Sequence, residues 1–201
     1  MIEEIRELLS KESKAVAAIP VNDSFIKAID LIHRHVHQQG GKLISGGMGK
    51  AGQIAINIAT TFSSTGTPAV FLHPSDAQHG DLGVIQDNDI LLLISNSGKT
   101  REILELLQLA KQLVRQIPVI VITGNPGTEL AQQADVVLHT GNPPEVCPLG
   151  LTPTTSTTAM TVIGDVLVVL MMKKIGFTSE AYAKRHHGGY LGAKSKGLGK
   201  L

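Results

Sequence analysis

The sequence predicts a doubly wound α/β domain built on a five-stranded parallel sheet flanked by helices. Its 201 residues suit one domain of this class or two small ones. Short apolar runs, mostly β-branched residues and leucine, are bounded by turn residues, as is typical of strands that are buried on both faces. The stretches between the later runs have the helical pattern and the length that a βαβ crossover needs.

The elements follow in order along the chain. The expected strands are Leu43–Ile44, Ala69–Leu72, Ile90–Ile94, Val119–Ile122 and Val136–Leu138. The expected crossover helices lie at about 50–64, 100–116 and 127–134. Leading helices within residues 1–39, at about 2–18 and 23–38, are separated by Pro20 and closed by Gly40 and Gly41, and a long helix at about 155–174 ends at Gly176. We expect a single domain over 1–201 with a flexible tail after about residue 192.

Composition excludes several classes of protein. Lysine plus arginine exceeds aspartate plus glutamate by only 18 − 17 = +1, and aromatics are 3%, so neither a basic field nor stacking rings for nucleic acid or a membrane surface are expected. The only cysteine, Cys147, excludes an intrachain disulfide framework, and the acidic start differs from a signal peptide, which together predict a cytoplasmic protein. The apolar run 159–172 contains Asp165 and falls short of the ~18 residues of a spanning helix, so we expect a buried core helix.

Glycine is in surplus, at 21 residues, and part of that surplus forms the turn Gly47–Gly52 after the first strand. This turn formally matches a dinucleotide fingerprint, but the second strand runs into His73 with no acid for a ribose hydroxyl. Walker A also fails, because Ala51 replaces the Ser/Thr that would hold magnesium. What remains is a general anion site with Lys50, to which Ser45 and Gly49 could contribute, or a turn that needs glycine only for packing.

A second candidate anion site, Ser95–Thr100, follows the most apolar strand and leads into a helix. Ser95, Ser97 and Thr100 can surround a phosphate monoester while the helix amino terminus supplies amides. Lys99 would oppose the helix dipole unless an anion binds there, although serine and threonine are also ordinary helix caps. The run Thr154–Thr158 before the long helix, beginning with Thr154 and Thr155, could add hydroxyls to the same pocket.

Several motifs together make a resemblance specific. The segments Ser95–Gly98 with Thr100, Gly49–Gly52 and His79–Gly83 resemble the sugar isomerase (SIS) domain. The segments Cys147–Thr154 and His186–Gly192 narrow the resemblance to D-arabinose 5-phosphate isomerases, and it extends in the same order over nearly the whole chain. Many members of that family carry two CBS domains after the SIS domain, so this chain resembles the single-domain form.

The resemblance implies an aldose–ketose isomerase that interconverts D-arabinose 5-phosphate and D-ribulose 5-phosphate and so feeds synthesis of Kdo and lipopolysaccharide. Proton transfers at carbon need no redox cofactor or metal, and we expect neither. By similarity, Glu145 and His186 would be the acid/base pair, Lys50 would stabilise the oxyanion, and His79 would orient sugar hydroxyls or open the ring. The resemblance further implies a homotetramer in which His186 reaches a neighbouring subunit's site.

Alternatives remain open on the sequence alone. Family members commonly have glutamate where this chain has Lys99, which leaves room for another SIS isomerase acting on a different sugar phosphate, or for a non-catalytic sugar-phosphate-binding regulator. A dinucleotide-dependent reductase is disfavoured by the missing acid. His33 and His37 share a helical face but have no evident third zinc ligand, and Cys147 has no adjacent base to activate it as a nucleophile.

Overall fold

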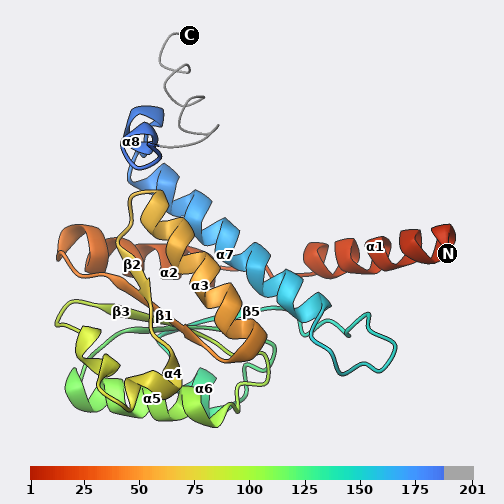
Figure 1. Cartoon of the computed structure of the whole chain (residues 1–201), viewed down its shortest axis with the longest axis horizontal. Helices are drawn as coiled ribbons and strands as arrows, with labels where there is room; N and C mark the ends of the chain where they lie inside the picture. Colours follow the sequence, from red (N-terminus) through yellow and green to blue (C-terminus); the bar gives the residue numbers. More distant parts are fainter. Residues whose placement is uncertain (188–201) are drawn as a thin grey trace.

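The computed structural model describes residues 1–187 of the chain, and its centre is a five-stranded sheet (Figure 1). All four pairings are parallel, and the strand order is β2-β1-β3-β4-β5. The strands are β1 (Leu43–Gly47), β2 (Ala69–Phe71), β3 (Ile90–Ile94), β4 (Val119–Thr123) and β5 (Val136–His139). The predicted doubly wound α/β class, with all five strands, is therefore confirmed.

The helices cover both faces of this sheet. They are α1 (Ile2–Ala17), α2 (Ser24–Ile32), η1 (His33–Gln38), α3 (Gly49–Ser64), α4 (Pro74–Ala77), η2 (Asp81–Val84), α5 (Arg101–Leu113), α6 (Glu129–Gln132), α7 (Thr155–Lys174) and α8 (Ser179–Ala183). The sequence did not predict α4, η2 or α8. The helix expected at 127–134 shortens to α6, and the one expected at 23–38 continues from α2 into a π-helical turn, η1.

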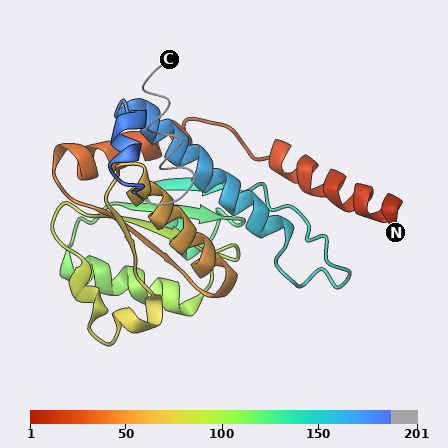
Figure 2. The ribbon, with the colours of Figure 1, turned by 45° about the horizontal axis from the view of Figure 1, so that its top comes forward.

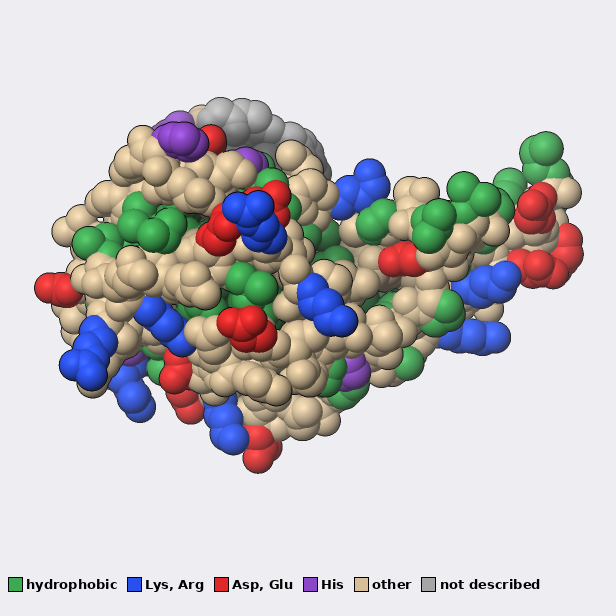
Figure 3. All heavy atoms as spheres, turned by 90° about the horizontal axis from the view of Figure 1, so that it is seen from below, with side chains coloured by type: hydrophobic (Ala, Val, Ile, Leu, Met, Phe, Trp, Pro, Cys, Tyr) green, Lys and Arg blue, Asp and Glu red, His purple; other side chains and the backbone are tan. Residues whose placement is uncertain are grey.

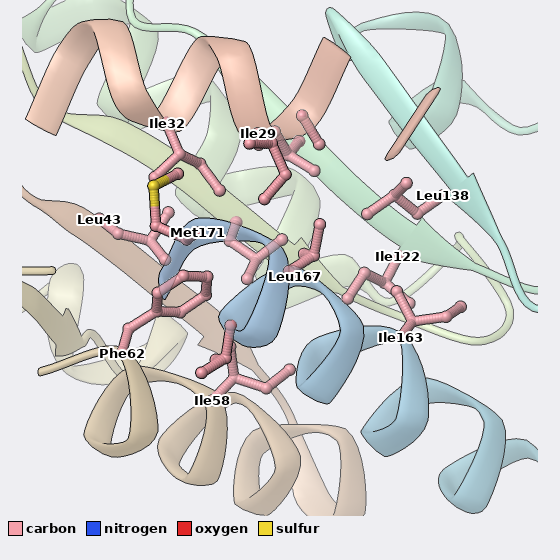
Figure 4. Close-up of a cluster of buried hydrophobic side chains, with 14 of the residues drawn as sticks. Ile29, Ile32, Leu43, Ile58, Phe62, Ile122, Leu138, Ile163, Leu167 and Met171 are labelled. Carbon is pink, nitrogen blue, oxygen red and sulfur yellow. The ribbon is translucent and has the colours of Figure 1, made fainter. Parts of the chain in front are cut away.

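Alternation along the strands builds two hydrophobic cores. In β3, Leu92 and Ile94 face a core formed with α2, α3 and α7, whereas Leu91 and Leu93 face a second core formed with α5. Figure 4 shows the first core, in which Phe62 of α3, Leu167 of α7 and side chains of α2 converge over the sheet. Burial on both faces explains why the strands are continuous apolar runs rather than alternating ones.

Helix α7 belongs to the first core. By length and composition it could cross a membrane, but half of its most apolar window is buried inside the domain. Gly164 lets it approach α3 closely, because a Cβ there would lie only 2.4 Å from Cγ1 of Ile58. The helix is therefore a core helix, as predicted.

Helix α1 is the exception to this compact packing. It extends away from the domain in both ribbon views (Figures 1 and 2), and none of its residues is buried. The flexible tail expected after residue 192, together with Gly188–Gly192 of the last motif, lies outside the described residues.

The strand order fixes where a ligand can bind. From β1 the chain passes to β2 on one side and then crosses to β3 on the other side, so β1 and β3 are neighbours whose connections diverge. In open parallel sheets such a switch point leaves a crevice outside the carboxyl ends of the strands. The glycine-rich turn after β1 and the hydroxyl-rich turn after β3 both border this crevice.

We expect Leu167→Ala to lower the free energy of unfolding by about 2–5 kcal/mol, because it removes a fully buried side chain from the first core. Asp165→Ala, at an exposed position of the same helix, should change it by about 0.5 kcal/mol or less. Urea unfolding monitored by circular dichroism measures both. Equal effects of the two substitutions would contradict the assignment of α7 to the core.

Candidate active site

A cavity of about 800 Å³ lies at the carboxyl edge of the sheet. Its walls are the turns after β1, β3 and β4, the loop between β5 and α7, and the first turns of α7. The lining side chains that can make polar contacts are Lys50, Ser95, Asn96, Ser97, Thr100, Asn125, Asn142, Glu145, Ser156 and Thr157. The structure thus brings the turn that carries Lys50, the hydroxyl turn and the loop that carries Glu145 to one cavity, as the sequence analysis expects.

The turn after β3 is held in shape by its own hydroxyls. The Ser95 and Thr100 hydroxyls are 2.8 Å apart, and the Gly98 amide donates to Ser95 Oγ over 3.2 Å. Gly98 has a φ of +66°, and a Cβ there would lie 2.2 Å from Oγ1 of Thr128, so only glycine fits. The turn ends at Thr100, the residue before α5, and Thr100 lines the cavity at the amino terminus of that helix, where helices leave backbone amides without intrahelical partners.

The turn after β1 presents Lys50. Gly47 lies so close to the first turn of α3 that a Cβ would come within 2.6 Å of the Ala51 carbonyl oxygen. Gly49, the first residue of α3, has a φ of +56° and no contact with the cavity, whereas the next residue, Lys50, is exposed and lines it. A cation at this position can neutralise charge that develops on a bound ligand.

The structure does not support Ser45 as a phosphate contact. Its side chain is fully buried, and its hydroxyl donates to the Ala55 carbonyl over 2.8 Å. Ser45 therefore ties β1 to α3 and lies outside the cavity lining. A hydroxyl at the end of a strand points to one face or to the edge according to register, which the sequence motif alone does not reveal.

Glu145 is fixed at the amino terminus of α7. Its Oε2 accepts hydrogen bonds from the Thr154 amide at 2.6 Å, the Thr154 hydroxyl at 2.9 Å and the Ser156 amide at 3.3 Å. These amides have no partner within the helix, so the carboxylate caps α7 and lies at the positive end of its dipole. Within residues 1–187, no hydrogen bond reaches Oε1, which leaves that oxygen available to a ligand.

The same contacts set the charge of Glu145. Partial burial acts to raise its pKa, but the Ser156 hydroxyl and the donors of Thr154 and Ser156 outweigh it, so the pKa lies below the ordinary value of a glutamate. Glu145 is therefore ionised at neutral pH. It is prepared to accept a proton rather than to donate one.

The run of hydroxyls from Thr154 to Thr158 divides between two tasks. Thr154 and Thr155 hold the loop, since the Val146 amide donates to both of their hydroxyls. Ser156 and Thr157 line the cavity and are the residues that can meet a ligand. Thr154 and Thr155, the members named as phosphate contacts, do not line the cavity; the third and fourth members of the run do.

Three asparagines in the lining were not among the predicted contacts. Asn96 lies within the hydroxyl turn, where the sequence analysis weighed only hydroxyls and the lysine. Its Oδ1 is buried, with no hydrogen-bond partner among the described residues. Asn125 and Asn142 lie two and three residues after the ends of β4 and β5, and this position after two strands was the signal that could have identified them.

Three other predicted residues lie outside this cavity. The Lys99 side chain is exposed and absent from the lining, so the inverted charge at this position is not directed into the cavity. His79 is exposed beside a hollow of about 260 Å³ at the start of α5, with Arg101 and Glu105. His186 follows α8, where its ring stacks on Tyr182 with centroids 3.7 Å apart. Helix α7, about 30 Å long, separates His186 from Glu145 in the same chain.

Comparisons with known proteins identify the family of this chain. The SIS domain family model matches residues 36–170, which is well over half of the chain. The chain belongs to the SIS domain family. Among the residues that the structure describes, no group of three or more histidine, cysteine, aspartate or glutamate side chains could hold a metal ion.

Its relatives include sugar-phosphate isomerases. Arabinose 5-phosphate isomerase KdsD of Yersinia pestis is 46% identical over 94% of this chain, and KdsD of Escherichia coli K12 is 44% identical. In both cases the match covers 56% of the relative, so this chain spans about half the length of the curated relatives it matches. It is thus related to the SIS part of KdsD.

Solved structures of two relatives resemble the whole domain. A candidate phosphosugar isomerase involved in capsule formation from Bacteroides fragilis is 66% identical with a TM-score of 0.93, covering 94% of this chain and 99% of the other. The protein c3406 of E. coli CFT073, solved in complex with arabinose 5-phosphate, is 34% identical with a TM-score of 0.85, covering 92% of this chain and 96% of the other.

We expect the charge of Glu145 to stabilise the fold above its pKa and to lose this effect as pH falls. Because the folded pKa is depressed, the stabilisation is complete above the pKa of the unfolded chain and disappears as pH falls through the folded value. Glu145→Gln should therefore cost roughly 0.5–1 kcal/mol at pH 7, and the difference from wild type should vanish under acid conditions. Denaturant unfolding at several pH values measures it. A difference that grows as pH falls would contradict the assignment.

Proposed function

We propose that the chain is an aldose–ketose isomerase that interconverts D-arabinose 5-phosphate and D-ribulose 5-phosphate. The observation that carries the proposal is the cavity shared by an ionised carboxylate, a lysine and a hydroxyl-rich helix amino terminus in a chain 46% identical to KdsD. These are the base, the oxyanion partner and the phosphate anchor that isomerisation requires. As in the family, the D-arabinose 5-phosphate formed would serve Kdo and lipopolysaccharide synthesis in the cytoplasm.

The phosphate group of the sugar would bind at the turn after β3. Ser97 and Thr100 present hydroxyls there, and the dipole of the 13-residue helix α5 favours an anion. Ser95, whose hydroxyl contacts Thr100 and Gly98, would shape this turn. Lys99 would add its charge from the outer side. Thr154 and Thr155 would act by holding the loop rather than by touching the phosphate.

The carbon chemistry would take place beside Glu145. Oε1 would remove the proton from C2 of the aldose, while the carbonyl oxygen at C1 takes a proton, which gives an enediol. Lys50 would stabilise the negative charge that develops on oxygen during this step. Return of the proton to C1, with loss of the hydroxyl proton at C2, then completes the ketose without a change in oxidation state. This sequence needs no redox cofactor or metal.

The acid that protonates oxygen would come from a second subunit. His186 lies beyond the far end of α7 in its own chain, so it would reach the cavity of a neighbour in a homotetramer. His79, exposed near the start of α5, would orient sugar hydroxyls or open the ring. The site would thus be shared between subunits, with sugar phosphate as the bound partner.

Turnover in D2O tests the chemistry and the substrate together. Wild-type protein should convert arabinose 5-phosphate and place deuterium on carbon, as measured by NMR. Glu145→Gln and Lys50→Ala should each lower kcat by about 10²- to 10⁴-fold, because they remove the base or the charge that stabilises the transition state. Arg115→Ala, an exposed change just after α5, is the matched control and should leave kcat unchanged.

Other outcomes of this assay separate the alternatives. Faster conversion of another pentose, hexulose or heptose phosphate would show that the proposed substrate is wrong and that the proposed mechanism still holds. Binding of a sugar phosphate without conversion of any would instead make the chain a regulator. Deuterium exchange by Glu145→Gln at the wild-type rate would contradict the role of Glu145.

Mixing two inactive variants tests the shared site. Glu145→Gln and His186→Ala homo-oligomers should each be nearly inactive. Random co-assembly should restore about a quarter of wild-type sites, since half the cavities would keep Glu145 and half of those would meet an intact His186. Recovery is measured by activity after co-expression, with sedimentation to follow assembly. No recovery from a mixed oligomer, or full activity in a monomer, would contradict sharing.

A further inference from the structure

We infer that Glu12 of α1 is a positioning residue for the proposed isomerisation, because it holds the hydroxyl that anchors the loop carrying Glu145. The inference rests on the proposed function for the identity of the reaction only. The structural link itself is a hydrogen-bonded chain from Glu12 through Thr155 to the backbone of Val146.

The geometry of Thr155 shows why Glu12 matters. The Thr155 hydroxyl donates to Glu12 Oε1 over 3.2 Å and accepts from the Val146 amide, also over 3.2 Å. A hydroxyl has one hydrogen, so its donation to Glu12 turns its lone pairs toward Val146. Thr155 is 1% exposed, which leaves little room for water to replace Glu12 as the acceptor.

This link lies beside the hydrogen bonds that hold the carboxylate of Glu145. Val146 directly follows Glu145, and Thr155 lies between Thr154 and Ser156, whose amides donate to Oε2. Release of the Thr155 hydroxyl would therefore loosen the loop and the cap together. The consequence would be a less well aimed Oε1 in the cavity.

The surroundings of Glu12 are unlike those of the other acids on α1. Glu3, Glu4 and Glu7 are exposed on the extended helix, where charged side chains alternate with hydrophobic ones (Figure 3). Glu12 instead turns toward α7, and its Oε2 is buried without a hydrogen-bond partner in the described part of the chain. A buried, unpaired oxygen is costly, so this orientation is not a device for stability.

The other charged groups near the loop come from two elements, α1 and α3. Lys11 and Lys14 of α1 line a hollow of about 700 Å³ together with Glu145 and Cys147. Lys50 lines the main cavity on the opposite side of the loop. Any variant that removes the Glu12 charge changes this balance, so the test compares two variants that both remove it.

The test compares Glu12→Ala with Glu12→Gln, with Glu7→Ala as the matched control on the same helix. Glutamine keeps an oxygen that can accept from Thr155, whereas alanine does not, and both lack the charge. We expect Glu12→Ala to lower kcat about tenfold with little change in KM, and Glu12→Gln to stay within about threefold of wild type. Glu7→Ala should match wild type.

Two further measurements separate positioning from general stability. The acid limb of the kcat profile should lie at higher pH in Glu12→Ala than in Glu12→Gln, because a loosened cap no longer holds the pKa of Glu145 down. Amide hydrogen exchange over residues 144–156 should be faster in Glu12→Ala and normal in Glu12→Gln. Thr155→Val should have the same effects as Glu12→Ala, and the double variant should show no further loss. If Glu12→Ala folds poorly, Thr155→Val tests the same link.

The outcomes distinguish this inference from the proposed function. If wild type isomerises no sugar phosphate but the exchange difference appears, the function fails and the link stands. If wild type is active while Glu12→Ala matches it in kcat, pH profile and exchange, the inference is overturned and the function stands. Equal losses in Glu12→Ala and Glu12→Gln would also overturn it, because charge rather than the hydrogen bond would then be responsible.

Discussion

The burial of a parallel sheet on both faces is the constraint on which the rest of this structure depends. Parallel strands need crossover connections, and those connections cover the two faces with helices. Every carboxyl end then meets at one edge, where turns from β1, β3 and β4 converge although they are far apart in sequence. Hydrophobic burial thus places the polar turn residues at this edge of the sheet. Because the connections from β1 and β3 run in opposite directions, a crevice opens between their turns.

Helix α7 converts this edge into a chemically distinct site. Its body is anchored in the first core by Leu167 and its neighbours, so its amino terminus has a fixed position over the cavity. Four amides without intrahelical partners make that end electropositive, and Glu145 occupies it with one carboxylate oxygen, while no hydrogen bond from residues 1–187 reaches the other. One residue thereby caps a core helix and supplies an ionised group, so stability and the proposed chemistry depend on the same hydrogen bonds.

The sequence was sufficient wherever hydrophobic periodicity decides the outcome. All five strands and the long helices follow from apolar runs and turn residues, and the main turns of the cavity follow from their place after those strands. It was insufficient where the role of a residue depends on the direction in which its side chain points. The hydroxyl of Ser45 turns to the Ala55 carbonyl, and the threonines at 154 and 155 hold a loop, because register and helix phase choose between inward and ligand-facing orientations. Short elements such as α4 and α8 carry too few residues for any periodic signal.

The position of His186 is a case in which simple geometry adds to a motif. Sequence similarity groups His186 with Glu145, yet a 20-residue helix of about 30 Å lies between them and is fixed in the core along its length. Leu167 and Met171 hold this helix on the sheet, so in the described conformation His186 and Glu145 lie beyond opposite ends of α7. This separation is why the proposed site takes His186 from a neighbouring chain. The exposed apolar side chains of α1, together with Val166 and Val169 of α7, form surface that the proposed contact between chains would cover.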